Sequence, residues 1–204
     1  MQSHQCIAHD AQLRTFLTQV MFEITLNHLV GVSIGPFCTV GSSVMLGNHC
    51  KLHPGSHVFG NTKLGDKCVL MSGAVVGDNI PGKTIIGCNN VIGHHAVVGI
   101  KCQDMKYKSG NECFLQVGDN NEIREHVSIH RSSKPCDRTV IGDNNLIMGS
   151  CHIAHDCKVG SNNIFANNTL LAGHVVVERV KQQQQSYPVF PTSSYKAISR
   201  VWGG

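Results

Sequence analysis

A six-residue hydrophobic repeat runs through most of this 204-residue chain. Its 21 positions, with three interruptions, are Ile34, Val40, Leu46, Leu52, Val58, Leu64, Leu70, Val76, Ile86, Ile92, Val98, Val117, Ile123, Ile129, Ile141, Ile147, Ile153, Val159, Phe165, Leu171 and Val177. Isoleucine, valine or leucine occupies 20 of these positions, although these types make up only 49 of the 204 residues. Chance does not produce such a register, so the repeat must reflect the fold.

The residues between the hydrophobic positions indicate tight turns. Glycine follows the hydrophobic residue at 11 of the 21 steps, and Asp/Asn clusters such as 119–121 and 143–145 come next. Glycine and asparagine tolerate the positive φ of tight turns. Hexapeptide periods are typical of parallel β-helices. We therefore predict an all-β solenoid of about seven 18-residue coils over residues 31–178, with coils ~4.8 Å apart.

The interruptions of the repeat fall at 77–85, 100–116 and 131–140. When the faces of the coil are assigned in order, all three interruptions lie at the same corner. Insertions on one side of a solenoid often mark its binding side. This corner is therefore the expected position of a functional site.

The two ends of the chain lack the hexad. Within residues 1–30, Leu13, Phe16, Leu17 and Val20 follow helical spacing, which predicts a short amphipathic helix that caps the first coil. Residues 179–204 carry a glutamine run and two prolines and are expected to form an irregular tail. The predicted organisation is therefore helix 1–30, β-helix 31–178 and tail 179–204.

Composition excludes several classes of protein. Hydrophobic residues are 41% and charged residues 15% of the chain, which excludes disorder, and no apolar run is long enough for a membrane span. A net charge of +4 does not indicate nucleic-acid binding. The ten cysteines form no CxxC pair, so we expect reduced, mostly buried thiols in an intracellular protein.

Histidines supply the candidate chemistry. When the hexads are assigned in order to the three faces of the coil, three histidines lie along one edge of the solenoid in consecutive coils: His130, His155 and His174. This edge adjoins the corner with the 100–116 insertion. Asp156 directly follows His155, and a histidine beside a carboxylate can act as a general base.

Metal binding is the rival interpretation of these residues. His152, His155, Cys151 and Cys157 lie close in sequence, and histidine and cysteine are zinc ligands. On a solenoid, however, the two cysteines lie one face apart and need not converge. The pair His94–His95 falls on another face and is interpreted as surface.

Four segments together resemble one family. They are 103–107 (QDMKY), 129–131 (IHR), 151–157 (CHIAHDC) and 167–174 (NNTLLAGH). In this order they are similar to the UDP-N-acetylglucosamine O-acyltransferases of lipid A biosynthesis, most of all to the plant form. The resemblance covers residues 31–178. It implies a left-handed β-helix, a homotrimer with active sites between subunits, and no cofactor. It also implies transfer of a 3-hydroxyacyl group from acyl carrier protein to the 3-hydroxyl of UDP-N-acetylglucosamine.

The resemblance also assigns roles to residues. His155 would be the general base, Asp156 would orient it, and the Gly173 N–H would stabilise the oxyanion. The substrate cleft would be lined by Gln103, Asp104, Lys106, His130, His152 and His174. A plant form would be mitochondrial and a bacterial form cytoplasmic.

The resemblance leaves alternatives open. The family continues with further coils and a C-terminal helical domain that are not found here, so we expect a truncated chain with impaired activity. One alternative is a metal-dependent trimer like the γ-class carbonic anhydrases. Another is a non-catalytic β-helix that only forms trimers.

Overall fold

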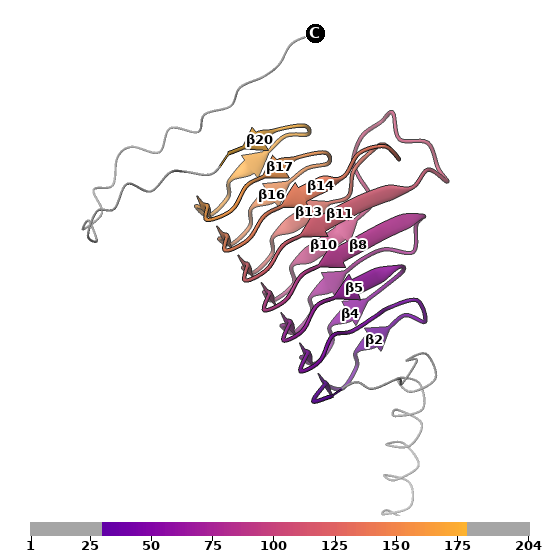
Figure 1. The fold of residues 1–204 in the computed structure, drawn as a ribbon, viewed down its shortest axis with the longest axis vertical. Coiled ribbons are helices and arrows are strands. Elements are labelled where there is room, and N and C mark those ends of the chain that lie inside the picture. Colours follow the sequence, from indigo (N-terminus) through magenta and orange to yellow (C-terminus); the bar gives the residue numbers. More distant parts are fainter. Residues whose placement is uncertain (1–29, 179–204) are drawn as a thin grey trace, which may run out of the picture.

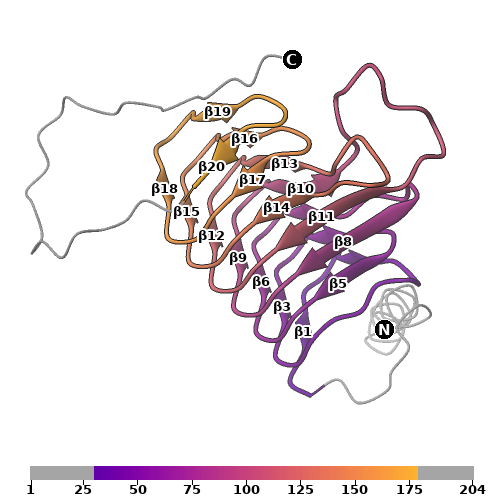
Figure 2. The ribbon, with the colours of Figure 1, turned by 45° about the horizontal axis from the view of Figure 1, so that its top comes forward.

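The protein folds as a parallel β-helix of short strands, as the hexad predicts. The computed structural model describes residues 30–178, so the expected N-terminal helix and C-terminal tail lie outside the described residues. The strands form three parallel sheets, in which each strand pairs with strands one coil away (Figure 1, Figure 2). Residues 30–178 contain no helix with the length and hydropathy needed to cross a bilayer.

Each sheet collects one strand from successive coils. The first sheet contains β1 (Ser33–Ile34), β3 (Lys51–Leu52), β6 (Val69–Leu70), β9 (Val91–Ile92), β12 (Glu122–Ile123), β15 (Leu146–Ile147) and β18 (Ile164–Phe165). The second contains β2 (Thr39–Val40), β4 (His57–Val58), β7 (Val75–Val76), β10 (Val97–Ile100), β13 (Ser128–His130), β16 (His152–Ile153) and β19 (Leu170–Leu171). The third contains β5 (Thr62–Leu64), β8 (Gly82–Ile86), β11 (Cys113–Val117), β14 (Thr139–Ile141), β17 (Lys158–Val159) and β20 (Val176–Val177).

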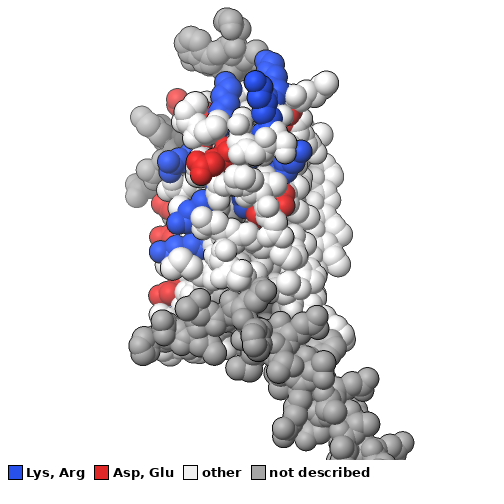
Figure 3. Space-filling view, turned by 90° about the vertical axis from the view of Figure 1, so that its right-hand side faces the viewer, with Lys and Arg blue, Asp and Glu red and all other residues white. Residues whose placement is uncertain are grey.

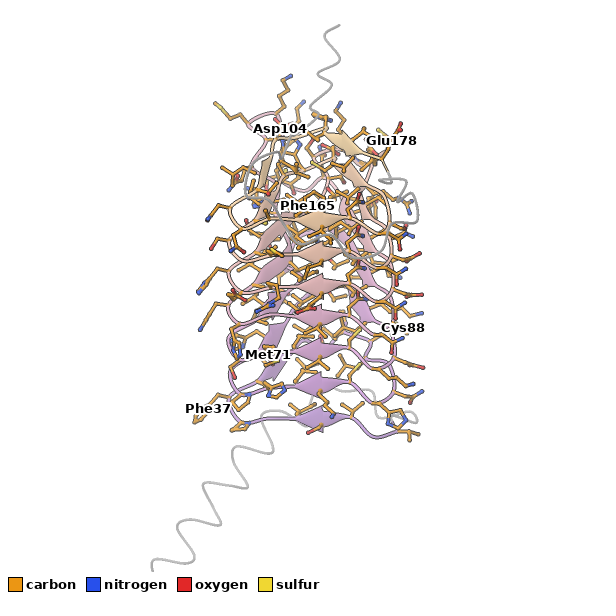
Figure 4. All side chains as sticks on the ribbon, turned by 90° about the vertical axis from the view of Figure 1, so that its left-hand side faces the viewer. Phe37, Met71, Cys88, Asp104, Phe165 and Glu178 are labelled. Carbon is orange, nitrogen blue, oxygen red and sulfur yellow. The ribbon has the colours of Figure 1, made fainter. Side chains whose placement is uncertain are left out.

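The hexad positions form the core. Of the 21 positions, 17 are buried, and the four half-buried ones lie in the first and last described coils. Adjacent coils place like positions in register, for example Ile129 against Ile153 and Ile153 against Leu171. Figure 4 shows the resulting rows of stacked side chains. The predicted register is therefore confirmed, including the burial of Ile147 and Ile153 at 0% and 1% exposure.

The three insertions do share one corner. Each joins the second sheet to the third, between β7 and β8, β10 and β11, and β13 and β14. Part of the first two insertions is strand, because β8 and β11 extend to five residues and pair with each other. The loop between β10 and β11 and the loop between β13 and β14 project from the same side of the solenoid (Figure 2).

Most glycines after the hydrophobic positions have a different role from the one predicted, although Gly77 and Gly99 do have the expected positive φ. Gly118 and Gly142 do not have positive φ. They lie above one another, and a β-carbon on Gly118 would come within 2.9 Å of the Gly142 backbone. Positive φ occurs instead two residues later, at Asn120 and Asn144. Glycine is therefore needed for close contact between coils, and asparagine supplies the left-handed turn.

Buried asparagines connect the coils at the corner before the first sheet. Asn121 donates its backbone N–H and its side-chain N–H to Oδ1 of Asn90, at 2.9 and 3.0 Å. Asn145 and Asn163 repeat both bonds, each to the asparagine one coil before it. This ladder satisfies polar groups that would otherwise be buried without partners. Among the described residues, Oδ1 of Asn163 has no partner.

Candidate active site

His155 and Asp156 form the centre of the candidate site. They lie in the turn after β16, where Asp156 has a φ of 62°. His155 Nδ1 lies 2.8 Å from Asp156 Oδ2, and the two side chains are 14% and 0% exposed. A carboxylate accepts hydrogen bonds, so Nδ1 carries the proton and Nε2 has a free lone pair. This is the tautomer that a general base needs.

Ser133 fixes the Asp156 carboxylate, and sequence reasoning did not find it. Its hydroxyl donates to Asp156 Oδ2 at 2.7 Å, and its backbone N–H lies 3.2 Å from the same oxygen. On the other side, the Asp156 N–H donates to Thr139 Oγ1 at 2.9 Å. Ser133 is buried and belongs to the 131–140 insertion. Because the insertion breaks the hexad, no spacing rule connects Ser133 to Asp156.

Gly173 and His174 lie one coil above His155. A β-carbon on Gly173 would come 2.6 Å from Cε1 of His155, so only glycine leaves room for the imidazole. Among the described residues, no acceptor pairs with the Gly173 N–H. The rings of His155 and His174 meet edge to face with centroids 5.1 Å apart. The structure therefore brings together His155, Asp156, Gly173 and His174.

His130 and His152 form a second imidazole pair, with ring centroids 5.1 Å apart. His130 Nδ1 donates to the Lys101 carbonyl at 2.7 Å, and His152 Nδ1 lies 2.7 Å from the Ser128 hydroxyl. Burial lowers the pKa of both histidines, which keeps them neutral near pH 7. Two neutral imidazoles can each both donate a hydrogen bond and accept one, so the pair can bind polar groups of a ligand.

The insertion between β10 and β11 supplies the remaining predicted residues. Asp104 lies near the end of the solenoid that carries Glu178 (Figure 4). Asp104 and Lys106 line a hollow of about 370 Å³, together with Lys108, Asn111, Ser133, Lys134 and Pro135. Figure 3 shows Lys and Arg side chains gathered at one end of a face of the solenoid. Gln103 is exposed and makes no polar contact with another described residue.

The structure does not favour the rival interpretation, because among the described residues Cys151 and Cys157 do not converge with His152 and His155 on a metal site. Cys151 and Cys157 are buried in the core, where their thiols donate to the carbonyls of Ala166 and Ala172 at 3.0 and 3.1 Å. Burial raises the pKa of both thiols, which disfavours the thiolate that a metal requires. Most other described cysteines are also buried and all nine are free, as predicted, although Cys136 is exposed.

Comparisons of sequence give consistent relatives. Residues 138–173 match the family described as bacterial transferase hexapeptide (six repeats). A "probable acyl-[acyl-carrier-protein]--UDP-N-acetylglucosamine O-acyltransferase, mitochondrial" of Arabidopsis thaliana is 80% identical over 127 residues, which are 62% of this chain and 38% of that protein. The acyl-[acyl-carrier-protein]--UDP-N-acetylglucosamine O-acyltransferase of Thermodesulfovibrio yellowstonii is 41% identical over 148 residues, 72% of this chain and 48% of that protein.

Solved structures agree with the sequence relatives. The Arabidopsis UDP-N-acetylglucosamine acyltransferase superposes with a TM-score of 0.73 at 79% identity, over 73% of this chain and 52% of that one. The Francisella novicida UDP-N-acetylglucosamine acyltransferase superposes with a TM-score of 0.65 at 35% sequence identity. The superposition covers 70% of this chain and 50% of the Francisella chain. The chain thus spans about half the length, or less, of these relatives.

The winding of the solenoid follows from the superposition. Mirror-image coils do not superpose, so the chain has the same left-handed winding as these structures, as the resemblance implied. Fold, hexad and the 80% identical segment all point to one group of proteins. Over the matched residues, this chain is similar, in its sequence and in its left-handed β-helix, to the hexapeptide-repeat UDP-N-acetylglucosamine O-acyltransferases.

Proposed function

We propose that the chain carries the acyl-transfer site of an acyl carrier protein-dependent UDP-N-acetylglucosamine O-acyltransferase, in the first step of lipid A biosynthesis. The observation that carries the proposal is the 2.8 Å contact of His155 Nδ1 with the buried carboxylate of Asp156. It leaves Nε2 of His155 free to accept a proton, as attack by a sugar hydroxyl requires.

The reaction proceeds in two steps at His155. Nε2 takes the proton of the sugar 3-hydroxyl while that oxygen bonds to the thioester carbonyl carbon of the acyl carrier protein. The Gly173 N–H, which no described acceptor occupies, donates to the resulting oxyanion. The C–S bond then breaks, and the proton on Nε2 passes to the departing thiolate. The products are the acylated sugar nucleotide and the free thiol of the carrier protein.

The remaining predicted residues surround this centre. His130, His152 and His174 provide neutral or exposed imidazoles for hydrogen bonds to substrate, and Asp104 and Gln103 lie on the adjoining loop. Lys106, Lys108 and Lys134 line the neighbouring hollow, whose positive charge suits the phosphates of a sugar nucleotide. The proposed substrate-binding set is therefore the one that the resemblance implied.

A homotrimer agrees with the surface of the second sheet. Its outward positions are Thr39, His57, Val75, Val97, Ser128, His152 and Leu170. None is charged, whereas the outward columns of the other sheets include Lys51, Glu122 and Lys158. An uncharged face that carries His152 fits contact with another subunit beside the site. The similar Arabidopsis protein is described as mitochondrial, which supports the same location for this chain.

The test is acyl transfer in solution. Purified protein is incubated with 3-hydroxyacyl carrier protein and UDP-N-acetylglucosamine, and both the released thiol and the O-acylated product are measured. The same assay is run on a chimaera in which the uncovered part of the Arabidopsis relative continues this chain. Product from the chimaera supports the proposal. A folded chimaera that forms no product overturns it.

Removing the Ser133 hydroxyl tests how Asp156 is held. We expect Ser133→Ala to lower kcat about 10-fold with little change in KM, because the 2.7 Å bond that positions Asp156 is lost while substrate contacts remain. The matched control is Ser56→Ala, which removes another buried hydroxyl, located next to Cys38. Equal kcat losses in both variants would show that Ser133 acts only through stability.

A further inference from the structure

Three side chains at the site converge on a single point. One ligand atom each of Asp104, His155 and His174 lies within 4.8 Å of the other two. His155 and His174 come from successive coils, after β16 and β19, and Asp104 comes from the insertion that follows β10. This is the single such group of three among residues 30–178.

The surroundings of these atoms resemble the outer shell of a metal site. Asp156 holds His155 by Nδ1 at 2.8 Å and lies 3.9 Å from Nε2 of His174. Metal-binding histidines commonly donate one ring N–H to a carboxylate, which orients the other nitrogen towards the metal. Ser133 in turn fixes that carboxylate. The Lys106 N–H donates to Asp104 at 2.8 Å and lowers its pKa, so the third ligand is ionised.

We propose that Asp104, His155 and His174 bind one divalent transition-metal ion, Zn²⁺ in preference to Mg²⁺. Two imidazole nitrogens and one carboxylate suit Zn²⁺, whereas Mg²⁺ requires six oxygen ligands in octahedral geometry. Zn²⁺ bonds of ~2.0–2.1 Å place tetrahedral ligands ~3.4 Å apart. The side chains therefore need to close by less than about 1.5 Å from their limit of 4.8 Å. The side chain of His174 is 55% exposed and is free to make this movement.

The bound ion acts as an inhibitor. It takes the lone pair of His155 that would otherwise accept the hydroxyl proton, so metal and substrate proton compete for one atom. This consequence rests on the proposed function, whereas the binding of the ion does not. The ion thus lowers activity, and a chelator restores it.

Cobalt absorption tests the binding directly. The chelator-treated full chain is titrated with Co²⁺, whose visible bands are intense in four-coordinate sites. We expect one Co²⁺ per chain, displaced by Zn²⁺ and not by Mg²⁺, and bound at least 10-fold more weakly by Asp104→Asn and by His174→Asn. Asparagine is chosen at residue 174 because it tolerates the φ of 64° there.

The control is His95→Asn, which removes an exposed histidine that stacks on His126 at another corner and also has positive φ. It should bind Co²⁺ like the original chain. Absence of the Co²⁺ bands, or equal affinity in all three variants, overturns the metal site. Acyl transfer by chelated protein is measured in parallel. A chain that binds Co²⁺ but transfers no acyl group, even as the chimaera, contradicts the proposed function and leaves the metal site in place.

Discussion

The His155→Ala variant is expected to transfer acyl groups about 10²–10⁴-fold more slowly than the original protein, the usual loss when a general base is removed. No other described imidazole has both a 2.8 Å contact with a buried carboxylate and a neighbouring backbone N–H that is free. His174 is 3.9 Å from Asp156 and more exposed, so it does not replace His155. Initial rates of thiol release in the chimaera give the measurement.

The matched control for this loss is His95→Asn, since His95 is exposed and stacks on His126 at another corner of the solenoid. Both variants should melt within a few degrees of the original protein, because His155 contributes no hexad position to the core. If His155→Ala kept more than about a tenth of the original rate, well above the range for a lost general base, His155 would not be the base.

The Ile147→Lys variant is expected to lose the folded state. Ile147 is fully buried between Ile123 and Phe165 in the first sheet. A lysine there has no acidic partner in the column, and an unpaired buried charge costs about 4 kcal/mol or more. Because domains are stable by only about 5–15 kcal/mol, we expect insoluble protein or loss of the β-sheet circular dichroism signal.

Ile164→Lys is the control for this substitution. Ile164 has the same side chain, lies on the adjacent strand β18 and is 67% exposed, so its charge stays in water. Its urea midpoint should match that of the original protein. Equal stability of the two lysine variants would contradict the assigned register.

The sequence was sufficient to predict the β-helix because one residue in six must face the interior. Inward positions such as Ile129 and Ile153 stack in register. A hydrophobic residue at every sixth position and a coil of 18 residues therefore determine the fold. The common corner of the insertions followed from the same count. The role of glycine in close contact between coils did not follow, because the amino-acid sequence alone does not show that Gly118 lies against Gly142.

The site was predictable only in part. His155, Asp156 and Gly173 lie at coil spacing in motifs that resemble a known family, and the structure brings them together. Ser133 and the carbonyl of Lys101 were missed, because both belong to insertions that follow no period. The 100–116 insertion also places Asp104 close to His155. This proximity depends on the conformation of a loop and not on any repeat.

The stacked asparagines give the solenoid an unequal tolerance to changes of length. Asn121 and Asn145 each donate to the asparagine of the coil before and accept from the asparagine of the coil after, so a duplicated coil would join such a column without loss of hydrogen bonds. Duplication between β3 and β9, where Cys50 and Cys68 occupy the equivalent positions, would lengthen the body outside this ladder and leave the chemistry unchanged. Duplication between His155 and His174 would move one imidazole a further ~4.8 Å from the other. Lineages of such proteins should thus vary in coil number outside the interval from β13 to β19 and keep it constant within.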